Sequence, residues 1–157
     1  MRRIHLGIQA AFVAVLVAVL ATAGVYAQQT TAPTANRLGA RSNPAAGSQA
    51  TASAAAIANF KHVADCVAFA GGSTTAPALT ALSVNLRDGA TGAGTVLWSQ
   101  QVVVSAATGQ NVAPFAVCGL NLPGTANTAM TLEFSASLAN LSESVALTYY
   151  DVNTAGQ

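Results

Sequence analysis

Few side chains in this sequence could take part in acid–base, nucleophilic or metal chemistry. Beyond residue 27, the ionisable residues are Arg37, Arg41, Lys61, His62, Asp65, Arg87, Asp88, Glu133, Glu143 and Asp151. A zinc site needs several His or Cys ligands, and a calcium loop needs several closely spaced carboxylates. The sequence groups neither set. We therefore predict that the protein is not an enzyme and that it holds no metal and no cofactor.

Two motifs resemble catalytic elements but lack essential parts. His62 and Asp65 are three residues apart, so on a strand they point to opposite faces, and no Gly-x-Ser-x-Gly elbow accompanies them. Residues 89–94 begin and end with glycine, as a phosphate-binding loop does. That loop also needs a lysine and a following helix, and both are missing. We interpret His62 as structural and residues 89–94 as a hairpin loop.

The two cysteines, Cys66 and Cys118, are predicted to form a disulfide, because an exported chain folds in an oxidising compartment. The alternative is a pair of buried free thiols, since cysteine also packs well as a small apolar residue. A catalytic thiol is disfavoured. In a strand, Cys66 would lie more than about 10 Å from His62, the only histidine available to activate it.

Three aromatic residues are candidates for ligand contact. Trp98, Tyr149 and Tyr150 fall in expected strands, and an exposed aromatic ring could stack on the face of a sugar. Tyr149 and Tyr150 are adjacent, so they must face opposite sides of a strand. Carbohydrate is therefore retained as an alternative ligand, although a tryptophan such as Trp98 more often belongs to the core. Nucleic acid is not expected as a partner, because the few basic residues are scattered.

The N-terminus has the organisation of an export signal. Arg2 and Arg3 precede an apolar run, Ala10 to Ala21, and a polar composition begins after Ala27. We predict a signal peptide over residues 1–27 and a secreted or periplasmic protein. The alternative is an uncleaved membrane anchor over residues 10–27. Residues 28–47 are rich in Ala, Thr and Pro and poor in apolar bulk, which predicts a flexible linker.

From residue 48 to 157 the apolar residues alternate with polar ones, which predicts half-buried β-strands. The expected strands are 60–70, 79–87, 95–104, 111–118, 128–138 and 144–153, with a less certain seventh at 49–54. Residues 53–57 could instead form a helical turn. Glycine, proline and aspartate turns separate the strands. The pattern predicts one all-β, antiparallel β-sandwich, either jelly-roll-like or immunoglobulin-like.

The surface predicted for this domain is unusually neutral. Its outward positions carry Ser, Thr, Asn, Gln and Ala, where soluble β proteins commonly place Lys and Glu to keep sheet edges from pairing. We hypothesise a structural domain that acts through contact with copies of itself or with another protein layer. Membrane contact is expected only through an uncleaved signal segment.

Two stretches of sequence resemble a known class of proteins. The run from Asn85 to Thr95, NLRDGATGAGT, and the run from Gly124 to Phe134, GTANTAMTLEF, look like uncharacterised β-sandwich proteins encoded by bacteriophages. The resemblance extends over roughly residues 49–152. It implies a structural, non-enzymatic role, as in decoration or tail-associated domains of virions. The export signal and the cysteine pair depart from that class and favour an exported bacterial relative.

Overall fold

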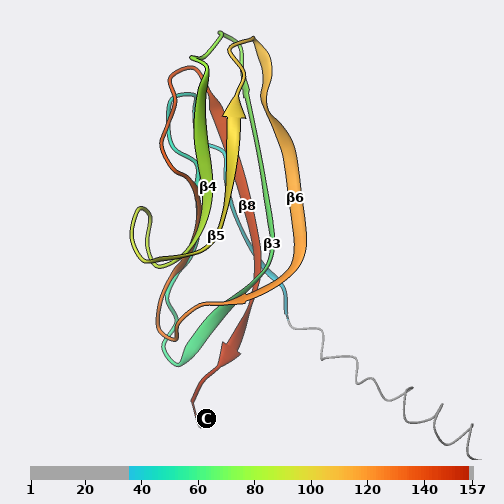
Figure 1. Ribbon diagram of the computed structural model, residues 1–157. Coiled ribbons are helices and arrows are strands. Elements are labelled where there is room, and N and C mark those ends of the chain that lie inside the picture. Colours follow the sequence, from blue (N-terminus) through green and yellow to red (C-terminus); the bar gives the residue numbers. More distant parts are fainter. Residues whose placement is uncertain (1–35, 156–157) are drawn as a thin grey trace, which may run out of the picture. The chain divides into compact units, whose positions relative to one another are not determined.

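The computed structural model describes residues 36–155, so the predicted signal segment and the first part of the predicted linker lie outside the described residues. Eight strands make up this part of the chain (Figure 1). They are β1 (Leu38–Ser42), β2 (Thr51–Ala54), β3 (Phe60–Ser73), β4 (Thr80–Asp88), β5 (Thr95–Val104), β6 (Gly109–Pro123), β7 (Met130–Phe134) and β8 (Ser142–Asn153). Within these residues, no helix has the length and hydrophobicity needed to cross a membrane.

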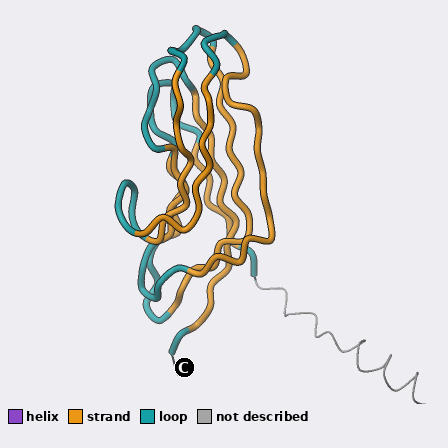
Figure 2. The backbone as a smooth tube through the Cα atoms, in the orientation of Figure 1, coloured by secondary structure: helices purple, strands orange, loops and turns teal. Residues whose placement is uncertain are grey.

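The strands form two four-stranded antiparallel sheets that pack face to face (Figure 2). Sheet A has the order β1-β8-β3-β6, and sheet B has the order β2-β7-β4-β5. The first strand pairs with the last, the second with the seventh, the third with the sixth and the fourth with the fifth. This is the pairing of a jelly roll, in which one long hairpin is folded across two sheets. The predicted all-β sandwich is confirmed, and of the two predicted orders the jelly roll is the one observed.

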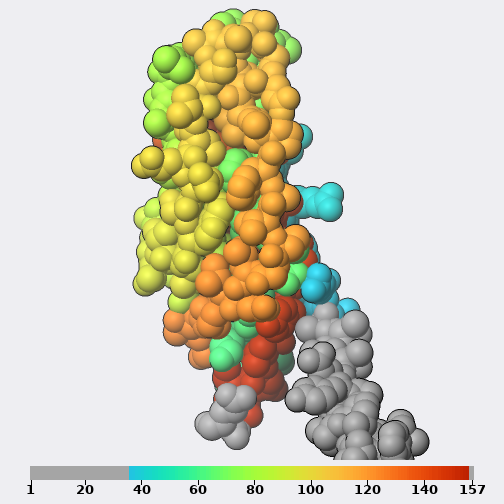
Figure 3. Space-filling view, turned by 45° about the vertical axis from the view of Figure 1, so that its right-hand side comes forward, coloured from blue at the N-terminus to red at the C-terminus, as the bar shows by residue number. Residues whose placement is uncertain are grey.

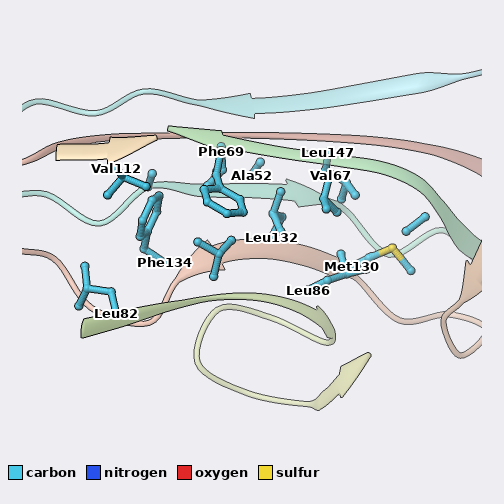
Figure 4. Close-up of a cluster of buried hydrophobic side chains, with 14 of the residues drawn as sticks. Ala52, Val67, Phe69, Leu82, Leu86, Val112, Met130, Leu132, Phe134 and Leu147 are labelled. Atoms are coloured by element: carbon cyan, nitrogen blue, oxygen red, sulfur yellow. The ribbon is translucent and has the colours of Figure 1, made fainter. Parts of the chain in front are cut away.

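The core fills the space between the sheets, and strand alternation explains which residues occupy it. In β4, Leu82, Val84 and Leu86 are buried while Ser83 and Arg87 between and beside them are half-exposed. Inward residues of β2, β3, β5, β6, β7 and β8 join them in the cluster (Figure 4). Its central members are Val67, Phe69, Met130, Leu132, Phe134 and Leu147. A side chain of this kind gains about 1.5–3 kcal/mol on full burial, so the cluster is the main source of stability.

The observed number of strands is eight, which corrects the prediction of six to seven. The additional strand, β1, lies within residues 28–47, where the composition predicts a flexible linker. Its side chains are mostly exposed, so the sequence there has no alternation of apolar residues that would predict a strand. Backbone pairing with β8 places it in sheet A, with Leu38 opposite Tyr149. The sandwich therefore begins before residue 48. The less certain strand near residue 50 is present as β2, and no helical turn replaces it.

Candidate interaction surface

Most charged side chains of the described domain form ion pairs or hydrogen bonds with other groups of the same chain. Arg37 pairs with the buried carboxylate of Asp65 at 2.9 Å, and Arg87 Nε donates to Glu133 Oε1 at 2.6 Å. Asp88 accepts from the backbone N–H and the hydroxyl of Thr125. These contacts satisfy the carboxylates locally. Consequently, they leave little charge for a partner to recognise.

His62 lies near the start of β3 in sheet A and is held there by two hydrogen bonds. It is 1% exposed, its Nδ1 lies 2.6 Å from Asp151 Oδ1, and its Nε2 lies 2.9 Å from the carbonyl oxygen of Ala55. The edge of the His62 ring packs against Tyr149. Both ring nitrogens thus face an oxygen of the protein itself, and the ring is buried, so neither nitrogen lies within reach of a substrate. Asp65, the residue that a triad would need, pairs with Arg37 instead.

Glu143 is fully buried beneath β2 and has no charged partner among the described residues. Its Oε2 accepts from the Ala50 backbone N–H at 2.9 Å, and its Oε1 is buried without a hydrogen-bond partner in the described structure. Loss of solvation raises the pKa of Glu143 from its ordinary 4.5 to about 7, and the backbone hydrogen bonds from Ala50 and Leu138 oppose this only in part. It is enclosed by protein and faces no opening, so we assign it no catalytic role.

Cys66 and Cys118 form a disulfide, as the sequence predicts. They are directly opposite each other in the register of β3 and β6, so the bond joins neighbouring strands of sheet A. It does not cross between the two sheets. Cys66 is half-buried and Cys118 is exposed, on the outer face of the sheet. A disulfide of this kind fits an oxidising compartment.

The outer face of sheet B is partly covered by the chain itself. The loop between β4 and β5 is hydrogen-bonded to β7. The Gly92 backbone N–H donates to the carboxylate of Glu133, and the Thr131 hydroxyl donates to the carbonyl oxygen of Gly89. Thr131 and Glu133 are buried as a result, although they point away from the core. The predicted hairpin loop is therefore confirmed and acts as a cover for this sheet.

The outer face of sheet A carries a floor of small side chains. Arg41, Ala146, Ala68 and Ala116 are aligned across β1, β8, β3 and β6 by the strand register. A shallow depression of about 550 Å³ lies over this row, and Asn43, Pro114 and Ser144 also line it. The alanines remain partly or fully accessible. Arg41 is the charged residue of this depression.

The side formed by β5 and β6 has no charged side chain on either strand. From residue 89 to residue 132 the sequence contains no ionisable Asp, Glu, Lys, Arg or His. Val103 is 71% exposed, Val96 44% and Phe115 37%. A hollow of about 250 Å³ opens between the two strands and is lined by Phe69, Gln100, Val102, Val112 and Phe115, among others.

The aromatic residues predicted to contact a ligand are not brought together. Trp98 lies in sheet B, where its ring stacks against Phe115 of sheet A at 6.1 Å between centroids. Tyr149 and Tyr150 lie on β8, and all three predicted residues are half-buried. Phe115 stacks in turn on Phe69 at 5.0 Å. Phe115 is more exposed than these three aromatic residues. In the sequence it stands directly after Ala113-Pro114 in a strand.

Comparison with known proteins gives only a distant structural likeness. No protein-family model matches the chain, and no curated protein matches it significantly. Among solved structures, the chain is similar to one described as "CBM4 structure and function", with 13% identity, a TM-score of 0.34, and coverage of 73% of this chain and 71% of that chain. It is also similar to the arabinose-bound MgGH51 α-L-arabinofuranosidase, with 13% identity, a TM-score of 0.37, and coverage of 78% and 21%. A third similar structure is the enzymatically active domain of tailspike protein 4 of bacteriophage CBA120. Its sequence identity is 11% and its TM-score is 0.27, with coverage of 75% of this chain and 19% of that chain. At these identities and TM-scores the likeness assigns neither a family nor a ligand.

Proposed function

We propose that this protein is an exported, non-enzymatic structural domain that acts through contact with copies of itself or with another protein layer. The observation that carries the proposal is the use of charge. The carboxylates of Asp65, Asp88 and Glu133 are bound within the domain, and the chain from residue 89 to 132 has no charge at all.

The physical reason is that charged surfaces resist association. Burying an ionised side chain in a contact costs desolvation energy, and like charges on identical copies repel each other. A surface built from Ala, Val, Ser, Thr and Gln meets neither penalty. The cores of protein interfaces are depleted in charged residues for the same reason. The described domain therefore has broad areas on which a protein partner can pack.

The proposal is tested by light scattering coupled to size-exclusion chromatography of the purified protein. We expect the mass to rise to at least twice that of one chain with increasing concentration. Because the contact is uncharged, we expect little change between low and high salt. A single-chain mass at every concentration, with no partner recovered from the cell envelope, would contradict the proposal.

Carbohydrate binding is the second candidate, and the depression on sheet A is the observation that favours it. Arg41, Asn43 and Ser144 could hydrogen-bond to sugar hydroxyls there, and Phe115 lies at its border. Ligand sites are commonly concave and have few polar groups. A thermal-shift screen against soluble glycans distinguishes the two functions, because only a glycan-binding domain gains stability from its ligand. The resemblance to phage-encoded sandwich proteins supports the structural role.

A further inference from the structure

The four edge strands of this sandwich differ in how they are protected. An exposed edge can pair with another chain, and proteins prevent this with short strands, proline, bulges or charged residues. In sheet A, β1 has 5 residues, and β6 contains Pro114, Pro123 and a positive φ of 75° at Gly119. In sheet B, β2 has only 4 residues. Three of the four edges therefore carry a protective feature.

The fourth edge, β5, carries such a feature only near one end, where its pairing with β4 is irregular. It has 10 residues, with the sequence TVLWSQQVVV, and contains no charge, proline or glycine. Valine, tryptophan and threonine all favour the strand conformation. The register shift in its pairing with β4 lies near one end, between Leu86 and Arg87, which leaves the run from Trp98 to Val104 regular.

The surroundings of β5 are also apolar. Six large hydrophobic residues are exposed between residues 36 and 155, and four of them lie here. They are Val96 and Val103 on β5, Phe115 on β6, and Leu79, which is next to the residue that pairs with Val104. Figure 3 shows β5 and β6 side by side on this face. The hollow between them is open to solvent. An unprotected edge and an apolar hollow thus occur on the same side of the molecule.

We propose that β5 pairs with β5 of a second copy of this chain, antiparallel and across a two-fold axis. This inference rests on the proposed function and identifies its contact surface and its partner. Sheet B would then continue from four strands to eight across the axis, and the second copy would close the hollow beside Phe115. Backbone N–H and C=O groups along the outer side of β5 would gain partners, as in other cases of strand addition.

Two considerations select a second copy as the occupant. Identical edges normally repel through their own charges, and no ionisable residue from 89 to 132 is present to do so. The area also suffices. Ten residues span roughly 33 Å and the two packed sheets are about 20 Å thick with their side chains, which gives about 650 Å² per copy. Stable protein interfaces bury about 600–1,000 Å² on each partner.

The experiment compares three variants of the whole protein by concentration-dependent light scattering. Val103→Lys places a charge within the proposed contact at an exposed position, and we expect it to weaken self-association at least tenfold. Val103→Thr, which keeps the strand propensity without a charge, should stay within threefold of the unaltered protein. Ala68→Lys, on the outer face of sheet A, should also leave association unchanged. Circular dichroism and thermal unfolding establish that each variant is folded.

Single cysteines introduced in turn at residues 99–103 provide a second measurement. In a two-fold antiparallel pair, the position nearest the axis meets its own copy, so we expect one or two of these positions to cross-link under mild oxidation. Unchanged association of Val103→Lys, or its loss in Ala68→Lys, would show that β5 is not the contact while leaving self-association itself in place. An unaltered protein that stays monomeric would instead refute the proposed function as well.

Discussion

At the scale of single residues, the domain uses ionisable groups for structure. His62 is fixed between Asp151 and the carbonyl oxygen of Ala55, and Glu133 binds both Arg87 and the loop at Gly92. The sequence predicted that His62 is structural, because Asp65 points to the opposite face of a strand and no Gly-x-Ser-x-Gly elbow is present. It could not identify Asp151 as its partner. That pairing depends on the register of β3 with β8, which places residues 62 and 151 opposite each other.

Glu143 makes the stability of the domain depend on pH. Its pKa is about 7 in the folded protein and about 4.5 in the unfolded chain. Between pH 4.5 and 7 the folded protein therefore keeps the carboxyl proton that the unfolded chain has lost. Stability from this group is complete below an unfolded pKa of about 4.5 and is lost as the pH rises through about 7. The loss is on the order of 3 kcal/mol.

We expect the isosteric substitution Glu143→Gln to remove this dependence. Urea unfolding at about pH 5 and pH 8 measures it, because the Glu143 carboxylic acid ionises over that range and a glutamine amide does not. The variant should gain stability over the unaltered protein at the higher pH and differ less at the lower one. An equal difference between the two proteins at both pH values would show that Glu143 does not ionise on unfolding in this range.

At the scale of elements, the strand alternation was sufficient to place most of the sheet. Leu82, Val84 and Leu86 face the core as predicted, since a period of two assigns them to one side. Strand β1 could not be predicted in this way, because it is held by backbone pairing with few buried side chains. The sequence also could not show which strands are edges. The edges follow from the order of the strands in each sheet, which places β5 at an edge of sheet B.

The loop over sheet B depends on glycine at one position more than at another. Gly94 has a φ of 80°, and a Cβ there would lie 2.1 Å from the carbonyl oxygen of Asp88. Gly92 has a similar φ of 70°, but a Cβ there would meet open space. We expect Gly92→Ala to cost about 1 kcal/mol from backbone strain alone, and Gly94→Ala to cost about 2–3 kcal/mol.

Chemical denaturation of both alanine variants measures this difference, and hydrogen exchange at residues 89–94 localises it. The Gly94→Ala loop should exchange faster because it can no longer place the Gly92 N–H on Glu133. Equal destabilisation of the two variants would mean that the close approach of Asp88 and Gly94 is relieved at no cost.

At the scale of the whole molecule, the disulfide adds a long-range constraint. Cys66 and Cys118 are 52 residues apart, and closing a loop of that length removes unfolded-state entropy worth about 4 kcal/mol in the chain-entropy model. Replacing both by serine should therefore lower the free energy of unfolding by up to about 4 kcal/mol. Urea unfolding measures this, and the unaltered protein under reducing conditions should follow the same curve. Coincident curves for the oxidised protein and the variant would contradict a stabilising bond.

The class of fold was predictable because many short alternating strands with turns between them fit few architectures. For the candidate interaction surface, the sequence predicted only that the outside of the domain carries few charged residues. Its location needed the structure, because Phe115, Val103 and Phe69 become neighbours only when β5 and β6 meet along one side of the sandwich.

The pairing of β1 with β8 determines when the domain can finish folding. Its earliest residues, such as Leu38, find their partner near Tyr149 only after β8 has been synthesised. Such distant pairings give a high contact order, and domains of this kind fold over milliseconds to seconds. Until β8 is available, β1 therefore has no strand to pair with, and sheet A cannot be completed.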